Sequence, residues 1–295
     1  MNIRKKISIK KTTLVVGVFF MMFLQFGCTK PGREPVTQNM DIQTPAGERL
    51  NTNISSKKER LIRLLSSPSS IFTDSKGEAS FLSNTILNNK EEFLKDLEVV
   101  LLNDPYDLLI LADKKHYLSE TYVPSDIIPL VVNNDYKLNR NDLSLRIPAE
   151  NALRQMAIAA NKDGISILVS STYRSYEYQK NLYERNVRQL GKEVADRESA
   201  QPGTSQHQLG TAVDFGSITD DFAYTKAGKW LDLHAGEYGF SLSYPDGYES
   251  VTGYRWECWH YRYVGKEAVL MQQKWFNNIQ QYMLEFIHYW KKAES

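Results

Sequence analysis

The sequence predicts an α+β fold with antiparallel strand pairing, and two features of the chain bear on this prediction. Helical and extended segments alternate through the middle of its 295 residues, an order that alone would suit a doubly wound sheet. Toward the end, however, predicted strands at 240–244 and 253–264 are joined by the turn residues Pro245, Asp246 and Gly247. A strand–turn–strand unit pairs antiparallel, so the sequence favours α+β.

The first 28 residues have the composition of a secretory leader. Residues 1–11 carry basic side chains and no acidic one, and an uncharged, largely apolar run covers residues 12–26. This run is short for a membrane span. It ends at Gly27 and Cys28, which predicts a lipoprotein-type signal peptide with Cys28 as the lipidated residue. An ordinary signal peptide and an uncleaved anchor are the alternatives.

Three further segments surround the predicted main domain, which covers residues 105–266. Residues 29–58 are polar and contain prolines, which predicts a flexible tether. Apolar residues recur at helical spacing in residues 59–104, which predicts a helical extension. Residues 267–295 carry methionine and aromatic side chains at the same spacing. They predict a C-terminal helix with a packing face, and contact with a membrane surface or a partner is the alternative.

The main domain contains the other predicted helices and strands. The predicted helices cover residues 148–163, 175–191 and 226–238, and the earlier predicted strands cover residues 108–112 and 165–170. The first helix begins with Pro148 and is closed by Gly164, residues typical of the two ends of a helix.

Charge and cysteine content exclude two broad classes of protein. The formal net charge is +1, and no basic tract interrupted by aromatic residues occurs, so nothing favours nucleic acid as a partner. The 2 cysteines, at positions 28 and 258, do not make a disulfide framework.

Two short stretches carry residue types that bind metals. His207 and Asp214 lie together in residues 203–216, and imidazole and carboxylate ligands together suit zinc. A third ligand, His260, lies further on with Glu257 beside it. Three protein ligands leave the fourth position of zinc to water, and a glutamate can take the proton of that water. The sequence therefore predicts a catalytic site with one Zn2+ per chain.

Each part of this set also has a plainer explanation. His207 could be an ordinary loop histidine, and Asp214 could cap a helix. Side chains alternate along a strand, so Glu257 and His260 share a face only if the chain bends near residue 258 or 259. By the same alternation Cys258 is a competing ligand. The remaining histidines do not lie in motifs of this kind and are expected to be structural or exposed: His116, His234 and His288.

Taken together, the motifs resemble the VanY-type D-alanyl-D-alanine carboxypeptidases, zinc peptidases of bacterial cell-wall metabolism. The motifs are Ser205-x-His207-x6-Asp214, Glu257-x-Trp259-His260-x-Arg262-Tyr263, and upstream residues 171–175 with Gln179, Leu182 and Tyr183. The resemblance covers about residues 105–266. It implies a small antiparallel sheet with the zinc site on one face and helices packed against the other. Cys258 departs from the pattern, because proline is common there in relatives.

The resemblance implies a role for each matched residue. His207, Asp214 and His260 would be the zinc ligands, Glu257 the general base, Arg174 the partner of the oxyanion, and Ser205, Tyr173 and Gln179 the substrate-binding positions. A guanidinium keeps its proton and offers several donors, which suits charge stabilisation. A structural ion pair is the alternative for Arg174.

We therefore expect a D,D-carboxypeptidase that removes the terminal D-alanine from peptidoglycan stem peptides. Two alternatives stay open: an L,D-carboxypeptidase acting on tetrapeptides, and a zinc-bearing lipoprotein that binds peptidoglycan without cleaving it. We also expect a monomer, and the leader predicts a protein of the cell envelope, held outside the cytoplasmic membrane by a lipid anchor.

Overall fold

The structure, a computed structural model, describes residues 45–66, 71–72 and 77–293, with the backbone alone described for residues 45–54. The predicted signal peptide, Cys28 and residues 29–44 of the predicted tether lie outside these ranges. None of the helices within the described ranges combines the length and the hydropathy that a membrane span requires.

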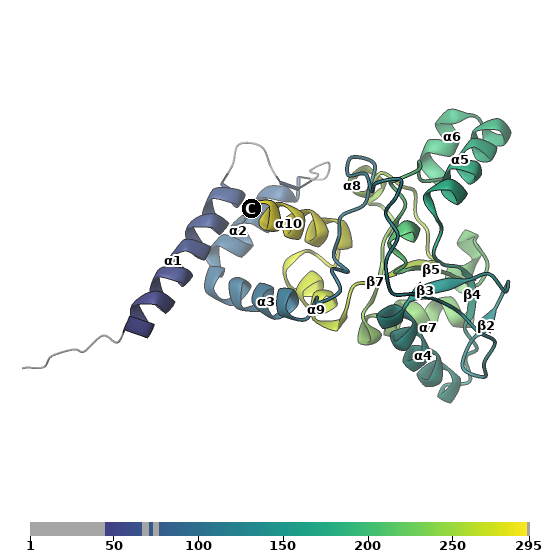
Figure 1. Ribbon diagram of the computed structural model, residues 1–295, viewed down its shortest axis with the longest axis horizontal. Helices are drawn as coiled ribbons and strands as arrows, with labels where there is room; N and C mark the ends of the chain where they lie inside the picture. Colours follow the sequence, from purple (N-terminus) through teal and green to yellow (C-terminus); the bar gives the residue numbers. More distant parts are fainter. Residues whose placement is uncertain (1–44, 67–70, 73–76, 294–295) are drawn as a thin grey trace, which may run out of the picture. The chain divides into compact units, whose positions relative to one another are not determined.

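A five-stranded sheet carries the predicted site residues, and its strands are ordered β2-β4-β5-β7-β6 (Figure 1). The strands are β2 (Lys137–Leu138), β4 (Leu168–Ser171), β5 (Ala212–Phe215), β6 (Phe240–Leu242) and β7 (His260–Tyr263). The pairs β4–β5, β5–β7 and β6–β7 are antiparallel, as the late strand–turn–strand unit predicts. β2 pairs with β4 in parallel, so the sheet is mixed and the prediction of a purely antiparallel sheet is wrong.

The parallel pair depends on a crossover that the sequence pattern did not indicate. Parallel neighbours need a long connection, and α4 (Ile147–Lys162) lies between β2 and β4 in the chain. The backbone N–H groups of Lys137 and Asn139 donate to the carbonyls of Ile167 and Val169, each at 2.9 Å. β2 has only 2 residues and no apolar run, so nothing in its composition predicts a strand. A separate antiparallel pair consists of β1 (Ile127–Pro129) and β3 (Ser144–Arg146).

The two faces of the sheet differ in character. Val213 and Phe215 of β5 and Tyr261 of β7 belong to a buried core that α4 and α7 (Lys226–His234) complete. Successive side chains of a strand point to opposite faces, so Asp214 and His260 point away from this core. The expectation of helices on one face and the site on the other therefore agrees with the structure. The remaining helices of this part are α5 (Tyr176–Leu190), α6 (Lys192–Glu198), α8 (Glu249–Thr252) and 3-10 helices at Gln206–Leu209, Asp220–Tyr224 and Ala235–Tyr238.

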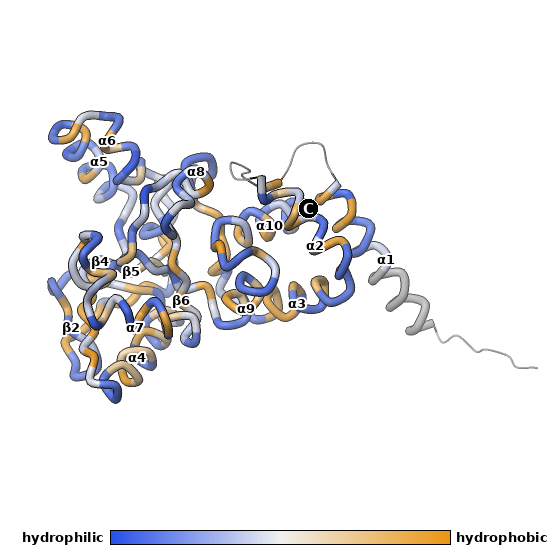
Figure 2. The backbone as a smooth tube through the Cα atoms, turned by 180° about the vertical axis from the view of Figure 1, so that it is seen from behind, coloured by the Kyte–Doolittle hydropathy of each residue, from blue (hydrophilic) through white to orange (hydrophobic). Residues whose placement is uncertain are grey.

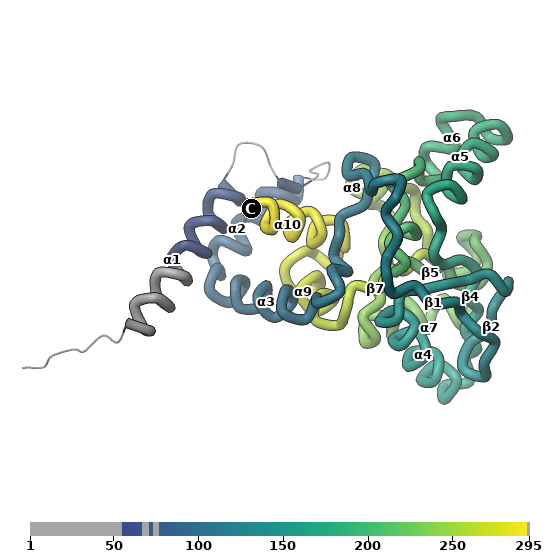
Figure 3. The backbone as a smooth tube through the Cα atoms, in the orientation of Figure 1, coloured from purple at the N-terminus to yellow at the C-terminus, as the bar shows by residue number. Residues whose placement is uncertain are grey.

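A second core is formed by helices from the two ends of the described chain, which meet in one bundle (Figure 3). These helices are α1 (Pro45–Leu65), α2 (Ala79–Asn88), α3 (Lys90–Leu102), α9 (Lys266–Trp275) and α10 (Gln280–Lys292). Hydrophobic and hydrophilic residues alternate along them, as expected for helices with one buried face (Figure 2). Phe93 of α3 packs edge-on against Phe286 of α10, with 4.9 Å between the ring centroids. The predicted packing face of the C-terminal residues is therefore confirmed.

Three local predictions differ from the structure. Residues 108–112, predicted as a strand, are irregular, and all of them except Ile110 are buried. The carbonyls of Leu108 and Ile110 accept hydrogen bonds from the guanidinium of Arg262. The single C-terminal helix predicted within residues 267–295 is two helices, α9 and α10. Between α9 and α10, Asn277 and Asn278 adopt left-handed φ values of 50° and 58°, a conformation that asparagine tolerates better than most residues. Helix α1 begins at Pro45, so residues 45–58 are helical where a flexible tether was predicted.

Candidate metal centre

Three predicted ligands from distant parts of the sequence meet on the site face of the sheet. His207 lies in the 3-10 helix at Gln206–Leu209, Asp214 in β5 and His260 at the start of β7. The register of β5 and β7 places Asp214 directly opposite His260. One donor atom from each of the three lies within 4.8 Å of the others, and all three side chains are buried. The structure therefore brings the predicted set together.

A glycine turns the chain between His207 and Asp214. Gly210 ends the 3-10 helix with a φ of 68°, in the left-handed region that favours glycine. A Cβ at this position would clash with Cδ1 of Ile127 and lie 2.9 Å from Cγ of Arg146. Both conformation and space require glycine here, and the turn sets His207 at the entrance of β5.

Hydrogen bonds determine which nitrogen each histidine offers. The Nδ1 of His207 lies 2.6 Å from the carbonyl oxygen of Thr172, so Nδ1–H donates to it and the lone pair of Nε2 faces Asp214. His260 uses the opposite nitrogens. Its Nε2 lies 3.2 Å from Oε1 of Gln206, and its Nδ1 lies 3.0 Å from Oδ1 of Asp214. Such partners on the far ring nitrogen are typical of metal-binding histidines.

The two oxygens of Asp214 have different surroundings. Oδ2 accepts a hydrogen bond from the guanidinium of Arg174 at 2.9 Å. Oδ1 is buried and accepts no hydrogen bond from any described residue. The ion pair with Arg174 favours the ionised form of this carboxylate. An ionised, buried oxygen without a hydrogen bond fits a metal ligand.

The donor set fits zinc. Burial, followed by the charge of Arg174, lowers the pKa of His207 to about 4, so its imidazole is neutral near pH 7 and has a lone pair to offer. Two imidazoles and one carboxylate are a common ligand set of catalytic zinc sites, which keep a further position open. A cavity of about 150 Å³ adjoins the three side chains. Its other lining residues are Arg174, Leu182, Asn186, Glu198, Ser199, Ala200, Ser205, Ile218, Tyr244, Tyr254, Glu257 and Trp259.

Glu257 lies beside the three donors and outside the ligand group. The bend that the prediction required is present, because residues 258 and 259 form a turn and His260 N–H donates to the Glu257 carbonyl at 3.1 Å. The turn brings Oε2 of Glu257 to 3.7 Å from Nδ1 of His260. Burial, followed by the charge of Asp214, raises the pKa of Glu257 to about 8. A carboxyl with a pKa near neutrality, in a cavity, suits proton transfer.

Arg174 is held at the edge of the ligand group by Asp214, Ser171 and Gln179. Its Nε and Nη2 donate to Oγ of Ser171 at 3.1 and 2.9 Å, and its Nη1 donates to Oε1 of Gln179 at 3.4 Å. Gln179 is 0% exposed, and its Nε2 donates to the carbonyl of Ala200 at 2.7 Å. This placement suits a glutamine that orients Arg174 better than one that contacts substrate.

The other predicted contact residues are divided between the cavity and its surroundings. Ser205 lines the cavity, and its Oγ accepts the N–H of His207 at 3.3 Å. Tyr173 is half-buried and lies outside the lining. Sγ of Cys258 lies 3.6 Å from the carbonyl oxygens of Thr219 and Asp220, and Cys258 belongs to the helix-side core. The strand alternation that made Cys258 a competing ligand does not apply, because residue 258 is in the turn.

The remaining histidines lie elsewhere. Nδ1 of His116 pairs with Asp113 at 2.8 Å, and the ring of His116 contacts that of His288. Nδ1 of His234 pairs with Glu237 at 2.8 Å on an exposed surface. Within the described part of the chain, none of the three joins the ligand group.

Residues that the motifs did not single out complete the site. The ring of Tyr244 lies 4.7 Å from that of His260, and burial raises the pKa of Tyr244 well above 10, so its hydroxyl stays neutral. Tyr254 packs against Tyr244, with 4.8 Å between the ring centroids. Gln206 contacts His260 from within the first motif. Position beside His207 was the one available signal for Gln206, since glutamine is not a typical zinc ligand.

The sequence of this chain is similar to those of known carboxypeptidases. The family model described as "VanY: D-alanyl-D-alanine carboxypeptidase" matches residues 142–266, which include all three donors and Glu257. The putative carboxypeptidase YodJ of Bacillus subtilis (strain 168) is 33% identical over 200 residues, which are 64% of this chain and 73% of that protein.

Two solved structures are similar in both sequence and fold. The LdcB LD-carboxypeptidase superposes with a TM-score of 0.55 at 33% identity, over 61% of this chain and 86% of that one. VanYB in complex with D-alanine-D-alanine superposes with a TM-score of 0.50 at 29% identity, over 61% of this chain and 97% of that one.

Proposed function

Because this chain belongs to the VanY D-alanyl-D-alanine carboxypeptidase family and is a zinc metallo-carboxypeptidase acting on peptidoglycan, we propose that it releases the terminal D-alanine of stem peptides. The observation that carries the proposal is the buried group of His207, Asp214 and His260 beside an open cavity that also holds Glu257. A domain that only binds peptides would need neither a base nor a cation at that place.

His207 and His260 would bind the ion through Nε2 and Nδ1, and Asp214 through the oxygen that accepts no hydrogen bond. Zinc supplies a Lewis acid and lowers the pKa of its water toward neutrality. We propose one ion per chain, because the described residues form one such donor group.

Glu257 acts as the general base and then as the general acid. Its carboxylate takes a proton from the attacking water and returns it to the amine of the departing D-alanine. The side chain of Glu257 is 12% exposed, so the proton it takes up is held near the leaving group.

Arg174 stabilises the negative charge that develops on the carbonyl oxygen of the cleaved bond. Two of its nitrogens are occupied by Ser171 and Asp214, and the long contact to Gln179 leaves donors that can turn to substrate. Ser205 lines the same cavity and is the proposed hydrogen-bonding partner of the substrate there. Tyr173, outside the lining, and buried Gln179 would act through the position of Arg174.

The family description favours D,D-cleavage of a pentapeptide that ends in D-alanyl-D-alanine. A specific observation favours L,D-cleavage of the tetrapeptide as a second candidate. LdcB, an LD-carboxypeptidase, is more similar to this chain than VanYB in both identity and TM-score. Glu198 adds an exposed carboxylate to the cavity lining, where it could attract the side-chain amine of a diamino acid that precedes the cleaved bond.

The test is hydrolysis of purified stem pentapeptide and tetrapeptide by the zinc-loaded protein, followed by chromatography. We expect D-alanine to be released from the pentapeptide first. Conversion of tetrapeptide to tripeptide while the pentapeptide persists would establish the second candidate. In that case Glu198→Gln should raise the KM for the tetrapeptide. If neither peptide is cleaved while zinc is bound, the proposal fails and a non-catalytic peptidoglycan-binding lipoprotein takes its place.

We also propose that the protein is lipid-anchored at Cys28 and acts in the cell envelope. The support is the basic and apolar leader that ends at Gly27 and Cys28, residues outside the described ranges. Mass spectrometry of the mature protein should find a lipid on Cys28, and an unmodified Cys28 would refute the anchor.

A further inference from the structure

A chain of buried side-chain amides and hydroxyls leads from the metal centre to the C-terminal helix α10. We propose that Gln280, the first residue of α10, is a positioning residue for His260 and acts through Gln206. This inference rests on the proposed zinc site. Gln280 lies outside the segment matched by the family model, which ends at residue 266.

The backbone carbonyl of Ser241 fixes the orientation of the Gln280 side-chain amide. Nε2 of Gln280 donates to the backbone carbonyl oxygen of Ser241 at 3.2 Å. A carbonyl oxygen only accepts, so the NH2 group of Gln280 must face Ser241 and its Oε1 must face the other way. There it accepts from Nε2 of Gln206 at 3.3 Å.

The orientation of Gln206 in turn fixes the tautomer of His260. Since Gln206 must turn its NH2 group toward Gln280, its Oε1 faces Nε2 of His260 at 3.2 Å. An amide oxygen only accepts, so Nε2 of His260 carries the proton. In the neutral imidazole, the form that binds a metal, the lone pair is then on Nδ1, the nitrogen that lies 3.0 Å from Asp214. A backbone carbonyl on β6 thus selects the tautomer of His260 through two glutamines.

Ser243 contacts both glutamines and His260. Its Oγ donates to Oε1 of Gln206 at 2.7 Å and lies 3.2 Å from Oε1 of Gln280. Its backbone N–H donates to the carbonyl of His260 at 3.2 Å. Gln206, Gln280 and Ser243 are 3%, 1% and 2% exposed, so water does not compete for these hydrogen bonds.

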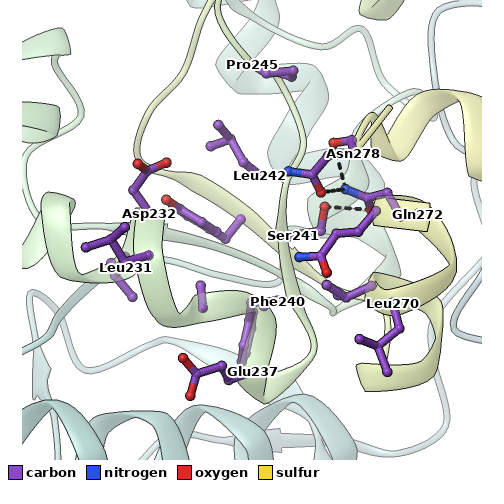
Figure 4. A pocket seen from close by; sticks show the side chains of 16 residues that line it. Leu231, Asp232, Glu237, Phe240, Ser241, Leu242, Pro245, Leu270, Gln272 and Asn278 are labelled. Atoms are coloured by element: carbon purple, nitrogen blue, oxygen red, sulfur yellow. Dashed lines mark hydrogen bonds between the residues drawn. The ribbon is translucent and has the colours of Figure 1, made fainter. Parts of the chain in front are cut away.

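A second set of hydrogen bonds fixes where α10 begins. Oγ of Ser241 donates to Oε1 of Gln272 at 2.9 Å, and Nε2 of Gln272 donates to the carbonyl of Asn278 at 2.9 Å and to its Oδ1 at 3.0 Å. Figure 4 shows these bonds at the wall of a cavity of about 240 Å³. They tie the left-handed break at Asn278 to β6, and this places Gln280 two residues later against Ser241.

The alternative is that Gln280 only satisfies buried polar groups and contributes to stability. The next residue of the helix distinguishes the two roles. Gln281 is also buried, but its Nε2 donates to Asp113 at 2.8 Å and to Glu285 at 3.1 Å, away from the metal centre. Gln281→Met is therefore a matched control for Gln280→Met.

The experiment measures the zinc affinity of the metal-free full chain by competition with a chelator, and the visible spectrum of the Co(II)-substituted protein. Gln280→Met should weaken zinc binding by about 10–100-fold and change the Co(II) spectrum. Gln281→Met should lower the melting temperature without either effect. If Gln280→Met does not fold, Gln280→Asn provides the test, because the shorter amide cannot reach both Ser241 and Gln206 and should weaken zinc binding in the same way.

A rescue variant separates positioning from stability. In Gln206→Glu the side chain accepts from Nε2 of His260 in either orientation, so it needs no orienting partner. Adding Gln280→Met to this variant should leave its zinc affinity unchanged. Equal zinc affinity in the wild type, Gln280→Met and Gln281→Met would overturn the proposal. Neither readout uses a peptide, so a wild type that binds zinc without cleaving peptides would sink the proposed function and leave this result standing.

Discussion

Asp214 and His260 face each other across two antiparallel strands, with 3.0 Å between Oδ1 of the carboxylate and Nδ1 of the imidazole. Backbone hydrogen bonds of the sheet, rather than the side chains themselves, set this pair of ligands. The third ligand, His207, comes from a short helix that Gly210 ends. Two of the three ligands are therefore fixed before any ion binds, which favours a preorganised site.

Replacing Glu257 with glutamine should abolish most hydrolysis and leave zinc bound. The amide keeps the shape of the side chain but cannot take a proton, so we expect kcat to fall by about 10²–10⁴-fold. Metal analysis of the purified variant should find as much zinc as in the wild type. Loss of zinc together with activity would show that Glu257 is a ligand.

Zinc binding near pH 7 should release a proton from Glu257. In the metal-free protein burial raises the pKa of this carboxyl to about 8, so the acid form predominates, and a nearby dication favours the carboxylate. Zinc affinity should therefore increase as the pH rises from 6 toward about 8. His207, with a pKa of about 4, should contribute no proton in this range.

Calorimetry in buffers of different ionisation enthalpy measures the protons released. Zinc-bound water can also release a proton, so the informative quantity is the difference between the wild type and Glu257→Gln. We expect the variant to release close to one proton fewer at pH 7. Equal proton release from both proteins would contradict the assigned pKa.

Arg174→Lys should slow catalysis without loss of metal. Lysine keeps the positive charge but cannot bond Ser171 and Asp214 in the same fork, so we expect kcat to fall by about 10²–10³-fold. Arg255→Lys is the matched control, because Arg255 pairs with Asp220 outside the cavity lining. Comparable loss of activity in both variants would indicate a general effect of removing an arginine.

Cys258→Ser should retain zinc and most activity. The hydroxyl can bond the same carbonyls of Thr219 and Asp220 that Sγ contacts, so the loss of stability should be about 1 kcal/mol. Thermal unfolding and metal analysis of the purified variant check both expectations. A variant that folds but binds no zinc would make the thiolate a ligand.

The sequence motifs predicted most of the metal centre but little of what supports it. His207, Asp214, His260 and Glu257 have ionisable or metal-binding side chains, and a short spacing connects each of the pairs His207–Asp214 and Glu257–His260. Gln280 lies 74 residues from its partner Gln206, and glutamine is common on ordinary helices, so no local pattern relates the two. Long-range hydrogen bonds of this kind depend on the packing of whole elements.

The fold shows the same division between local and distant information. Helix α4 was predictable from Pro148 and its apolar face, because both signals are local. The parallel pairing of β2 was not, because Lys137 and Leu138 are too short a segment to predict a strand and pair only beside β4. The break before α10 depends on Asn277 and Asn278, whose left-handed conformation is permitted by asparagine but not required by it.

The shared bundle of N-terminal and C-terminal helices has a consequence for the order of folding during synthesis. Leu61, Leu82 and Phe93 belong to a core whose other half includes Phe286 and Trp290 of α10. On the ribosome, α1, α2 and α3 emerge long before α10 and cannot bury these side chains until residues 280–292 have been made. The early helices therefore remain available to chaperones throughout translation, and the bundle forms only after synthesis of α10.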